Sequence, residues 1–148
     1  MAAIVGSVEI SRRPEDVFHY VTNSSHLPEW QESVVSVKRE SDAPVATGSR
    51  ATVTRRVGGR VMPTTTEVSK LDPPKSWGFR VVDGPVRGIE QGMIEPLDDG
   101  QRSRVTIALD FETYGIGKLL VPLVVRRTAQ RQLPTNMERL KDLLEQGA

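Results

Sequence analysis

Residues 116–145 read IGKLLVPLVVRRTAQRQLPTNMERLKDLLE, and this stretch predicts one long helix near the C-terminus. Its second half carries an apolar stripe at helical spacing, made of Leu133, Met137, Leu140 and Leu144. Its first half, residues 119–125, is apolar on every side and far too short to span a membrane. Such a segment is typical of burial all round or of a face kept for a ligand. The stripe needs a surface to cover, which the rest of the chain must supply.

A proline in this stretch allows a second interpretation. Pro134 removes one i to i−4 hydrogen bond, and the residues from Thr135 to Glu138 match a capping box. The stretch then forms two segments joined by a kink at Pro134. The later segment anchors the fold, whereas residues 119–125 form a cavity wall that moves, a hypothesis that hydrogen exchange on both sides of Pro134 would test.

The composition favours one cytoplasmic domain, residues 1–148. The chain has 20 basic and 19 acidic residues in a mixed order, so no footprint for nucleic acid or an anionic membrane stands out. It has no cysteine, which excludes disulfides and thiolate ligands. The N-terminal residues lack the features of a signal peptide, and no zinc spacing, Walker motif or dinucleotide fingerprint occurs. We expect no metal, no cofactor, no integral membrane association, and a monomer or weak homodimer.

The residues before the long helix alternate mostly with the period of β-strands. We expect a first strand over residues 4–10, then a helix that begins at Pro14 and a short helical turn over residues 26–30. Six further strands follow, the last centred on residues 105–111, with turns at Gly58-Gly59, Asp83-Gly84 and residues 98–100. Pro63 indicates an edge position or a bulge.

This order of elements predicts an α+β fold. Seven strands with one apolar face must curve around something, and the long helix is the only large element available. We therefore expect a curved, seven-stranded antiparallel sheet wrapped around the C-terminal helix, with two short helices after the first strand. The first strand should pair at the end of the sheet and cover one exposed edge.

The pattern resembles the helix-grip superfamily, which includes START lipid-transfer domains, Bet v 1-like allergens and polyketide cyclase/dehydrase proteins. The resemblance spans nearly the whole chain and is closest to the small bacterial polyketide cyclase/dehydrase and lipid-transport-like proteins. The resemblance rests on five segments: Pro14-Glu15-Asp16-Val17-Phe18, Leu27-Pro28-Glu29-Trp30, Leu71-Asp72-Pro73-Pro74, Asp99-Gly100 and the final Leu140–Glu145 segment. It implies an apolar cavity between sheet and helix, whereas the chemistry inside varies between members.

Arg55 is the most specific candidate in this cavity. It interrupts an otherwise apolar inward face made by Ala51, Val53 and Val57, so its guanidinium is placed to hold a carboxylate, phenolate or enolate oxygen. The alternative is a bulge that turns Arg55 to solvent. An inward carboxylate beside Arg55, with Glu67 and Glu90 available on other strands, would have a lowered pKa and act as a base.

The remaining candidates also have structural interpretations. Thr64 and Thr66 offer hydroxyl groups but are ordinary strand residues. Trp77, Phe79, Leu109 and Phe111 line a pocket for a flat ligand or fill the core. Trp30 gates the cavity or fixes the short helices to the sheet. From the long helix we add Leu120, Leu123 and Val124 as cavity wall, and Arg126, Arg127 and Arg131 form a basic flank that serves docking or is simply solvated.

Three functions remain open. The first is binding of a small hydrophobic or lipid-like ligand between sheet and helix. The second is a polyketide cyclase or dehydratase, although no catalytic residue is assigned, because neither His19 nor His26 is convincingly placed and Asp110 and Glu112 should face solvent. The third is a co-chaperone-like or toxin-like interaction module.

Overall fold

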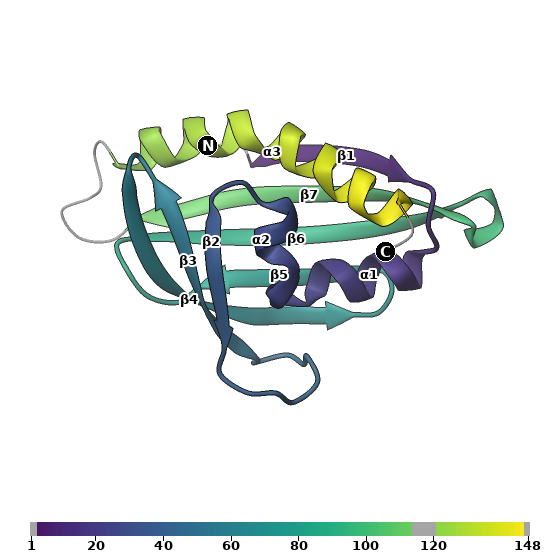
Figure 1. Cartoon of the computed structure of the whole chain (residues 1–148), viewed down its shortest axis with the longest axis horizontal. Coiled ribbons are helices and arrows are strands. Elements are labelled where there is room, and N and C mark those ends of the chain that lie inside the picture. Colours follow the sequence, from purple (N-terminus) through teal and green to yellow (C-terminus); the bar gives the residue numbers. More distant parts are fainter. Residues whose placement is uncertain (1–2, 114–120, 147–148) are drawn as a thin grey trace.

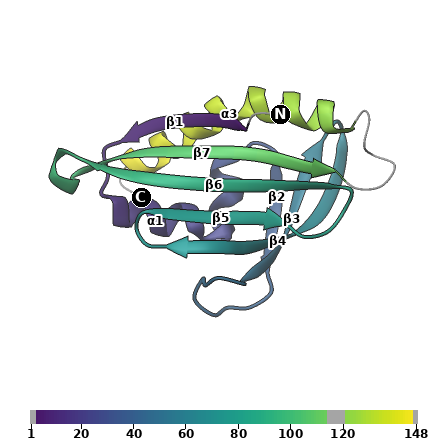
Figure 2. The same ribbon diagram turned by 180° about the vertical axis from the view of Figure 1, so that it is seen from behind.

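The computed structural model describes residues 3–113 and 121–146. It forms one curved sheet with helices on its concave side (Figures 1 and 2). In chain order the elements are β1 (Ile4–Ile10), α1 (Pro14–Thr22), η1 (Ser24–His26), α2 (Leu27–Trp30), β2 (Val34–Arg39), β3 (Arg50–Val57), β4 (Arg60–Asp72), β5 (Ser76–Val81), β6 (Val86–Leu97), η2 (Asp98–Gly100), β7 (Arg102–Thr113) and α3 (Val121–Glu145).

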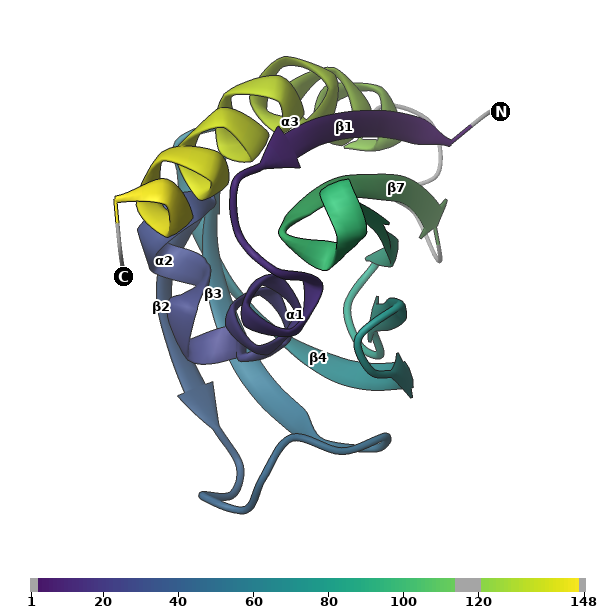
Figure 3. The same ribbon diagram turned by 90° about the vertical axis from the view of Figure 1, so that its right-hand side faces the viewer.

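The sheet has seven strands in the order β1-β7-β6-β5-β4-β3-β2, and all neighbours are antiparallel. The α+β prediction is confirmed, and β1 pairs with β7 at the end of the sheet as expected. Figure 3 shows the sheet curling around α1, while α3 lies across its open side. Because α3 packs on β1 and on α2, and α2 packs on β2, the helices join the two edges of the sheet.

Two turn predictions are explained by the backbone. Gly58 and Gly59 have φ of 57° and 81°, the positive values that a two-residue hairpin requires. Pro63 pairs with Thr54 of β3, but pairing of β4 with β5 begins only at Thr66. Pro63 therefore lies on a locally free edge, where its missing N–H costs no ladder hydrogen bond.

The core lies between the concave face of the sheet and the helices. Phe18 of α1 packs edge-on against Trp77 of β5, with ring centroids 6.4 Å apart. The predicted helical stripe is confirmed, since Leu133, Met137, Leu140 and Leu144 are each at most 5% exposed. Helix α3 thus fixes the sheet through its second half.

The stretch is not broken at Pro134, because residues Val121–Glu145 form one continuous helix, α3. Movement of its first half stays a prediction for hydrogen exchange. Pro134 lies on the exposed side of the helix, and the buried stripe continues on both sides of it. Packing of Leu133 and Met137 against Gly6 of β1 holds the helix together across the missing hydrogen bond.

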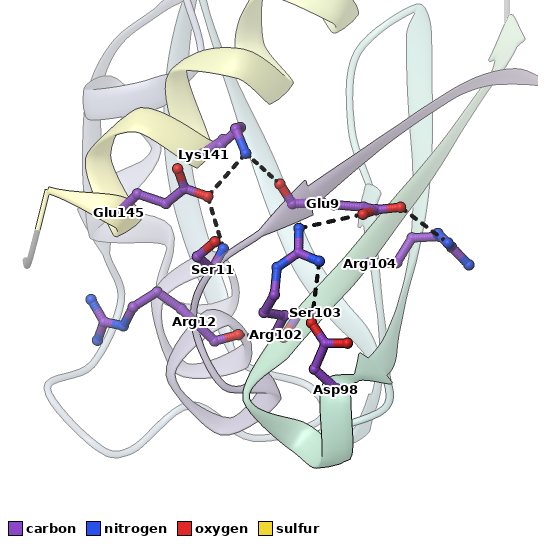
Figure 4. A network of polar contacts seen from close by, with 9 residues as sticks. All are labelled: Glu9, Ser11, Arg12, Asp98, Arg102, Ser103, Arg104, Lys141 and Glu145. Carbon is purple, nitrogen blue, oxygen red and sulfur yellow. Dashed lines mark hydrogen bonds and ion pairs between the residues drawn. The ribbon is translucent and has the colours of Figure 1, made fainter.

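Polar contacts also secure the second half of α3 (Figure 4). Lys141 Nζ donates to the Glu9 carbonyl at 2.8 Å, and the Ser11 N–H donates to Glu145 Oε2 at 2.8 Å. Arg12 Nη1 donates to the Leu144 carbonyl, also at 2.8 Å. The connection after β1 is therefore attached to the last turns of the helix.

The first half of α3 differs. From Leu123 to Gln132 no residue is buried, and Leu123 and Val124 are 47% and 52% exposed. The alternative of burial all round is wrong for these two side chains. Nowhere in residues 3–113 and 121–146 is there a helix with the length and apolar character needed to cross a membrane.

Candidate functional site

Arg55 is turned toward the concave interior. It follows the buried Ala51 and Val53 at alternating positions of β3, and the register shift in this part of the sheet lies in β2, between Val34 and Ser36. The alternative in which a bulge turns Arg55 to solvent is therefore wrong. Its guanidinium is held by two neutral groups, since Nη1 donates to Gln31 Oε1 at 2.9 Å and to Ser33 Oγ at 3.1 Å.

Local chain geometry explains why these two partners meet Arg55. Helix α2 ends at Trp30, and the Gln31 N–H caps it by donating to the Leu27 carbonyl at 2.8 Å. Strand β2 then begins at Val34, which pairs with Arg55 itself. The short link between α2 and β2 thus places Gln31 and Ser33 beside the guanidinium.

Glu90 is the second charged residue on this face. On β6 it alternates with Gly92 and Ile94, both buried. Its Oε2 accepts a hydrogen bond from Trp77 Nε1 at 2.8 Å. A Cβ at Gly92 would overlap the Trp77 ring, so only glycine lets the indole lie flat across β6 and reach Glu90.

Burial changes the pKa of both charged groups. Desolvation raises the pKa of Glu90, and the hydrogen bond from Trp77 and the charge of Arg55 only partly oppose it. Desolvation likewise lowers the pKa of Arg55, against the charge of Glu90. Sequence reasoning expected a lowered pKa for an inward carboxylate beside Arg55. For Glu90 that direction is wrong, because the two groups form no direct ion pair and desolvation dominates.

Arg55 and Glu90 each have polar atoms that are free to bind a further group. Both remain partly accessible rather than sealed in the core. Among the described residues, no hydrogen bond is formed by Nε or Nη2 of Arg55, or by Oε1 of Glu90. Guanidinium N–H groups bind carboxylate, phenolate or enolate oxygens, while a carboxyl group of raised pKa accepts or donates a proton. By these chemical properties Arg55 is suited to hold an oxygen and Glu90 to exchange a proton. Neither side chain lines the two concave spaces described below.

The other predicted site residues fall into three groups. Trp30, Val53, Trp77 and Phe79 are buried core residues, and Trp30 packs the short helices onto the core. Thr64, Thr66, Leu109 and Phe111 are half-buried on the concave side. Leu123 and Val124 are exposed on α3, away from the core, and Leu120 lies outside the described residues.

Two concave spaces border the described residues. An open groove of about 630 Å³ flanks α1 and is bounded by the segments around Val45 and Pro73. None of the twelve predicted site residues lines it. A void of about 20 Å³ touches Thr66 and Phe79, and the Thr66 hydroxyl is buried there without a hydrogen-bond partner in the described part of the chain.

The histidines and outer carboxylates play no part in the Arg55 site. His26 stacks on Tyr20 at 4.3 Å and contacts Glu29 at 3.1 Å. Asp110 and Glu112 are exposed, as alternation predicted. Within residues 3–113 and 121–146, no group of three or more His, Cys, Asp or Glu side chains is placed to hold a metal ion.

Sequence reasoning missed two contributors to the site, Gln31 and Ser33, and left a third, Glu90, without an assigned face. Gln31 and Ser33 lie in a short link with no periodicity, and only strand pairing brings them to Arg55. Glu90 was named without a face, because its inward neighbours on β6 are Gly88 and Gly92 and the apolar alternation is lost there. The alternation of β6, counted back from the apolar Ile94 in steps of two, would have assigned Glu90 to the inward face.

The chain has a helix-grip fold, and two charged side chains, Arg55 and Glu90, lie on the concave face of its sheet. Residues 1–145 match the family described as polyketide cyclase/dehydrase and lipid transport. The chain belongs to this family. No match was found among curated protein sequences.

Solved structures share the fold at low sequence identity. The Zhui aromatase/cyclase from Streptomyces sp. R1128 aligns with a TM-score of 0.80 at 14% identity, over 97% of this chain and 93% of that chain. TTHA0849 from Thermus thermophilus gives 0.77 at 17%, over 99% of each chain. A START superfamily protein from Mycobacterium smegmatis gives 0.70 at 15%, over 98% and 95%. At such identities the likeness shows the fold alone.

Proposed function

We propose that the chain, as one domain, binds a small, largely hydrophobic molecule on the concave face of the sheet and holds its polar end with Arg55. The observation that carries this proposal is the neutral support of the guanidinium by Gln31 and Ser33. No carboxylate forms an ion pair with the Arg55 guanidinium in the described part of the chain. Its remaining N–H groups are therefore available to an anionic or enolic oxygen. Family membership supports an apolar ligand of this kind.

The test uses two fluorescent probes of nearly the same shape. 1-Anilinonaphthalene-8-sulfonate carries one anionic group, whereas N-phenyl-1-naphthylamine carries none. Arg55→Gln should weaken binding of the sulfonate about tenfold or more, the value of a hydrogen bond to a charged group, and leave the neutral probe nearly unchanged. The control is Arg56→Gln, which removes the adjacent, exposed arginine of β3. The proposal would be contradicted if both variants lost the same affinity for the sulfonate probe, or if neither probe showed saturable binding.

Glu90 favours a second candidate, an enzyme of the polyketide cyclase or dehydratase type. A half-buried carboxyl group whose pKa is raised by desolvation, on the same concave face as a guanidinium, is suited to general acid or base catalysis of enolisation and dehydration. On this proposal Glu90→Gln abolishes dehydration of a β-hydroxyketone test compound but changes affinity for the sulfonate probe by no more than about twofold. Unchanged turnover in the variant would exclude Glu90 from catalysis.

Partners and location belong to the same proposal. A cytoplasmic protein that is monomeric or weakly dimeric and does not bind nucleic acid fits the near balance of 20 basic and 19 acidic residues. Size-exclusion chromatography with light scattering measures the oligomeric state directly.

A further inference from the structure

The first half of α3 carries an exposed face that neither packing nor ligand binding uses. Leu123, Arg127 and Arg131 follow one another at steps of four residues, which places them along one side of the helix. Val124 lies beside Arg127 on the same side. All four side chains are exposed, and the buried stripe lies on the other side of the helix. Two aliphatic side chains are thus interleaved with two guanidinium groups.

The charged residues in this part of the helix are all basic. Residues 121–137 contain three arginines and no acidic residue, so the rest of the chain has 17 basic and 19 acidic residues. Neither Arg127 nor Arg131 forms an ion pair within the described part of the chain. The balanced total charge therefore conceals a local cationic surface.

Helix stability does not explain this order of charges. Cations are favourable near the C-terminus of a helix and anions near its N-terminus. In α3 neither preference is met, since the first turn has no acidic residue and the last turn has no basic one. Glu138, Arg139 and Asp142 are exposed in the second half, where both signs of charge occur. In the first half the exposed charged residues are Arg127 and Arg131. The helix dipole therefore does not account for the arginines of the first half, and an external partner of opposite charge would.

We propose that the exposed face of α3 formed by Leu123, Val124, Arg127 and Arg131 docks on an anionic phospholipid surface. Interfacial helices combine aliphatic side chains that enter the headgroup region with cationic side chains that meet anionic lipids. A nucleic acid would match the arginines but leave Leu123 and Val124 exposed. A second copy of the chain would place the aliphatic pair against the polar C-terminal end of α3 in an antiparallel pairing. This inference goes beyond the proposed function and does not depend on it.

The experiment is co-sedimentation of the full chain with vesicles, either of pure phosphatidylcholine or with about 30% phosphatidylserine, at about 0.1 M salt. We expect binding to the anionic vesicles only. Arg127→Gln with Arg131→Gln should weaken it by about 25-fold, or about fivefold for each arginine. Leu123→Ser with Val124→Ser should also weaken it, and thermal melts should stay unchanged because both side chains are exposed.

The matched control is Lys38→Gln with Lys70→Gln, which removes the same charge from exposed positions on β2 and β4. It should bind as the unmodified protein does. The proposal would be overturned if the protein did not bind anionic vesicles or bound both vesicle types equally. It would also be overturned if the control variant lost as much vesicle affinity as the double arginine variant. A dimer in light scattering that the double arginine variant abolishes would overturn it as well, because that result would assign the face to a second copy. Arg55→Gln should leave vesicle binding unchanged, which separates this test from that of the ligand site.

Discussion

At the scale of single residues, the site depends on one charged side chain supported by neutral groups and another supported by an indole. Arg55 is held by Gln31 and Ser33, and Glu90 accepts a hydrogen bond from Trp77. Because neither charge is neutralised by direct contact, both are disfavoured by burial. Charged groups with strongly shifted pKa values cluster at functional sites, which makes Arg55 and Glu90 candidates for such a site.

The raised pKa of Glu90 predicts a pH-dependent effect of Glu90→Gln. A carboxyl group with a higher pKa in the folded state binds its proton more tightly there, so it stabilises the fold at low pH. That contribution is lost as the pH rises through the folded-state pKa. Glutamine keeps an acceptor for Trp77 and never ionises. Urea unfolding should therefore show the variant to be more stable than the unmodified protein at pH 8, and this difference should shrink as the pH falls toward the ordinary glutamate pKa of about 4. A difference that grows on acidification would contradict the assignment.

At the scale of elements, α3 has two unlike halves. Its second half buries a full apolar stripe and is attached by hydrogen bonds to β1 and the residues after it (Figure 4). Its first half has no buried residue from Leu123 to Gln132. The sequence spacing predicted the stripe correctly. It did not predict exposure of Leu123 and Val124, because apolar character on every side of a helix is equally compatible with burial.

The two halves predict different costs for the same substitution. Leu140→Ala removes a side chain that is 0% exposed and should destabilise the protein by about 2 to 5 kcal/mol. Leu123→Ala removes one that is 47% exposed and should change stability by no more than about 0.5 kcal/mol. Chemical denaturation of both variants measures the difference. A loss below about 1 kcal/mol for Leu140→Ala would mean that the sheet does not grip the helix.

At the scale of the whole molecule, the sheet and the helices divide two tasks. The curved sheet places Arg55 and Glu90 on one concave face, although they lie on β3 and β6. Helix α3 lies across the open side of the sheet (Figures 1 and 3). Its second half carries the buried stripe, whereas Leu123 and Val124 in its first half are 47% and 52% exposed. The total charge of +1 says nothing about this division, because the arginines of α3 are offset by acidic residues elsewhere in the chain.

Sequence patterns predicted the order of the elements, the turn at Gly58-Gly59, an edge position or a bulge at Pro63, and the buried stripe of α3. These are local properties, since periodicity, positive φ and a missing N–H act within a few residues. Three features instead arise from the assembled fold: Gln31 and Ser33 meet Arg55, Glu90 shares its concave face, and Leu123 and Val124 are exposed. These features depend on strand pairing across distant segments and on the desolvation that the assembled core imposes. No local pattern records either effect.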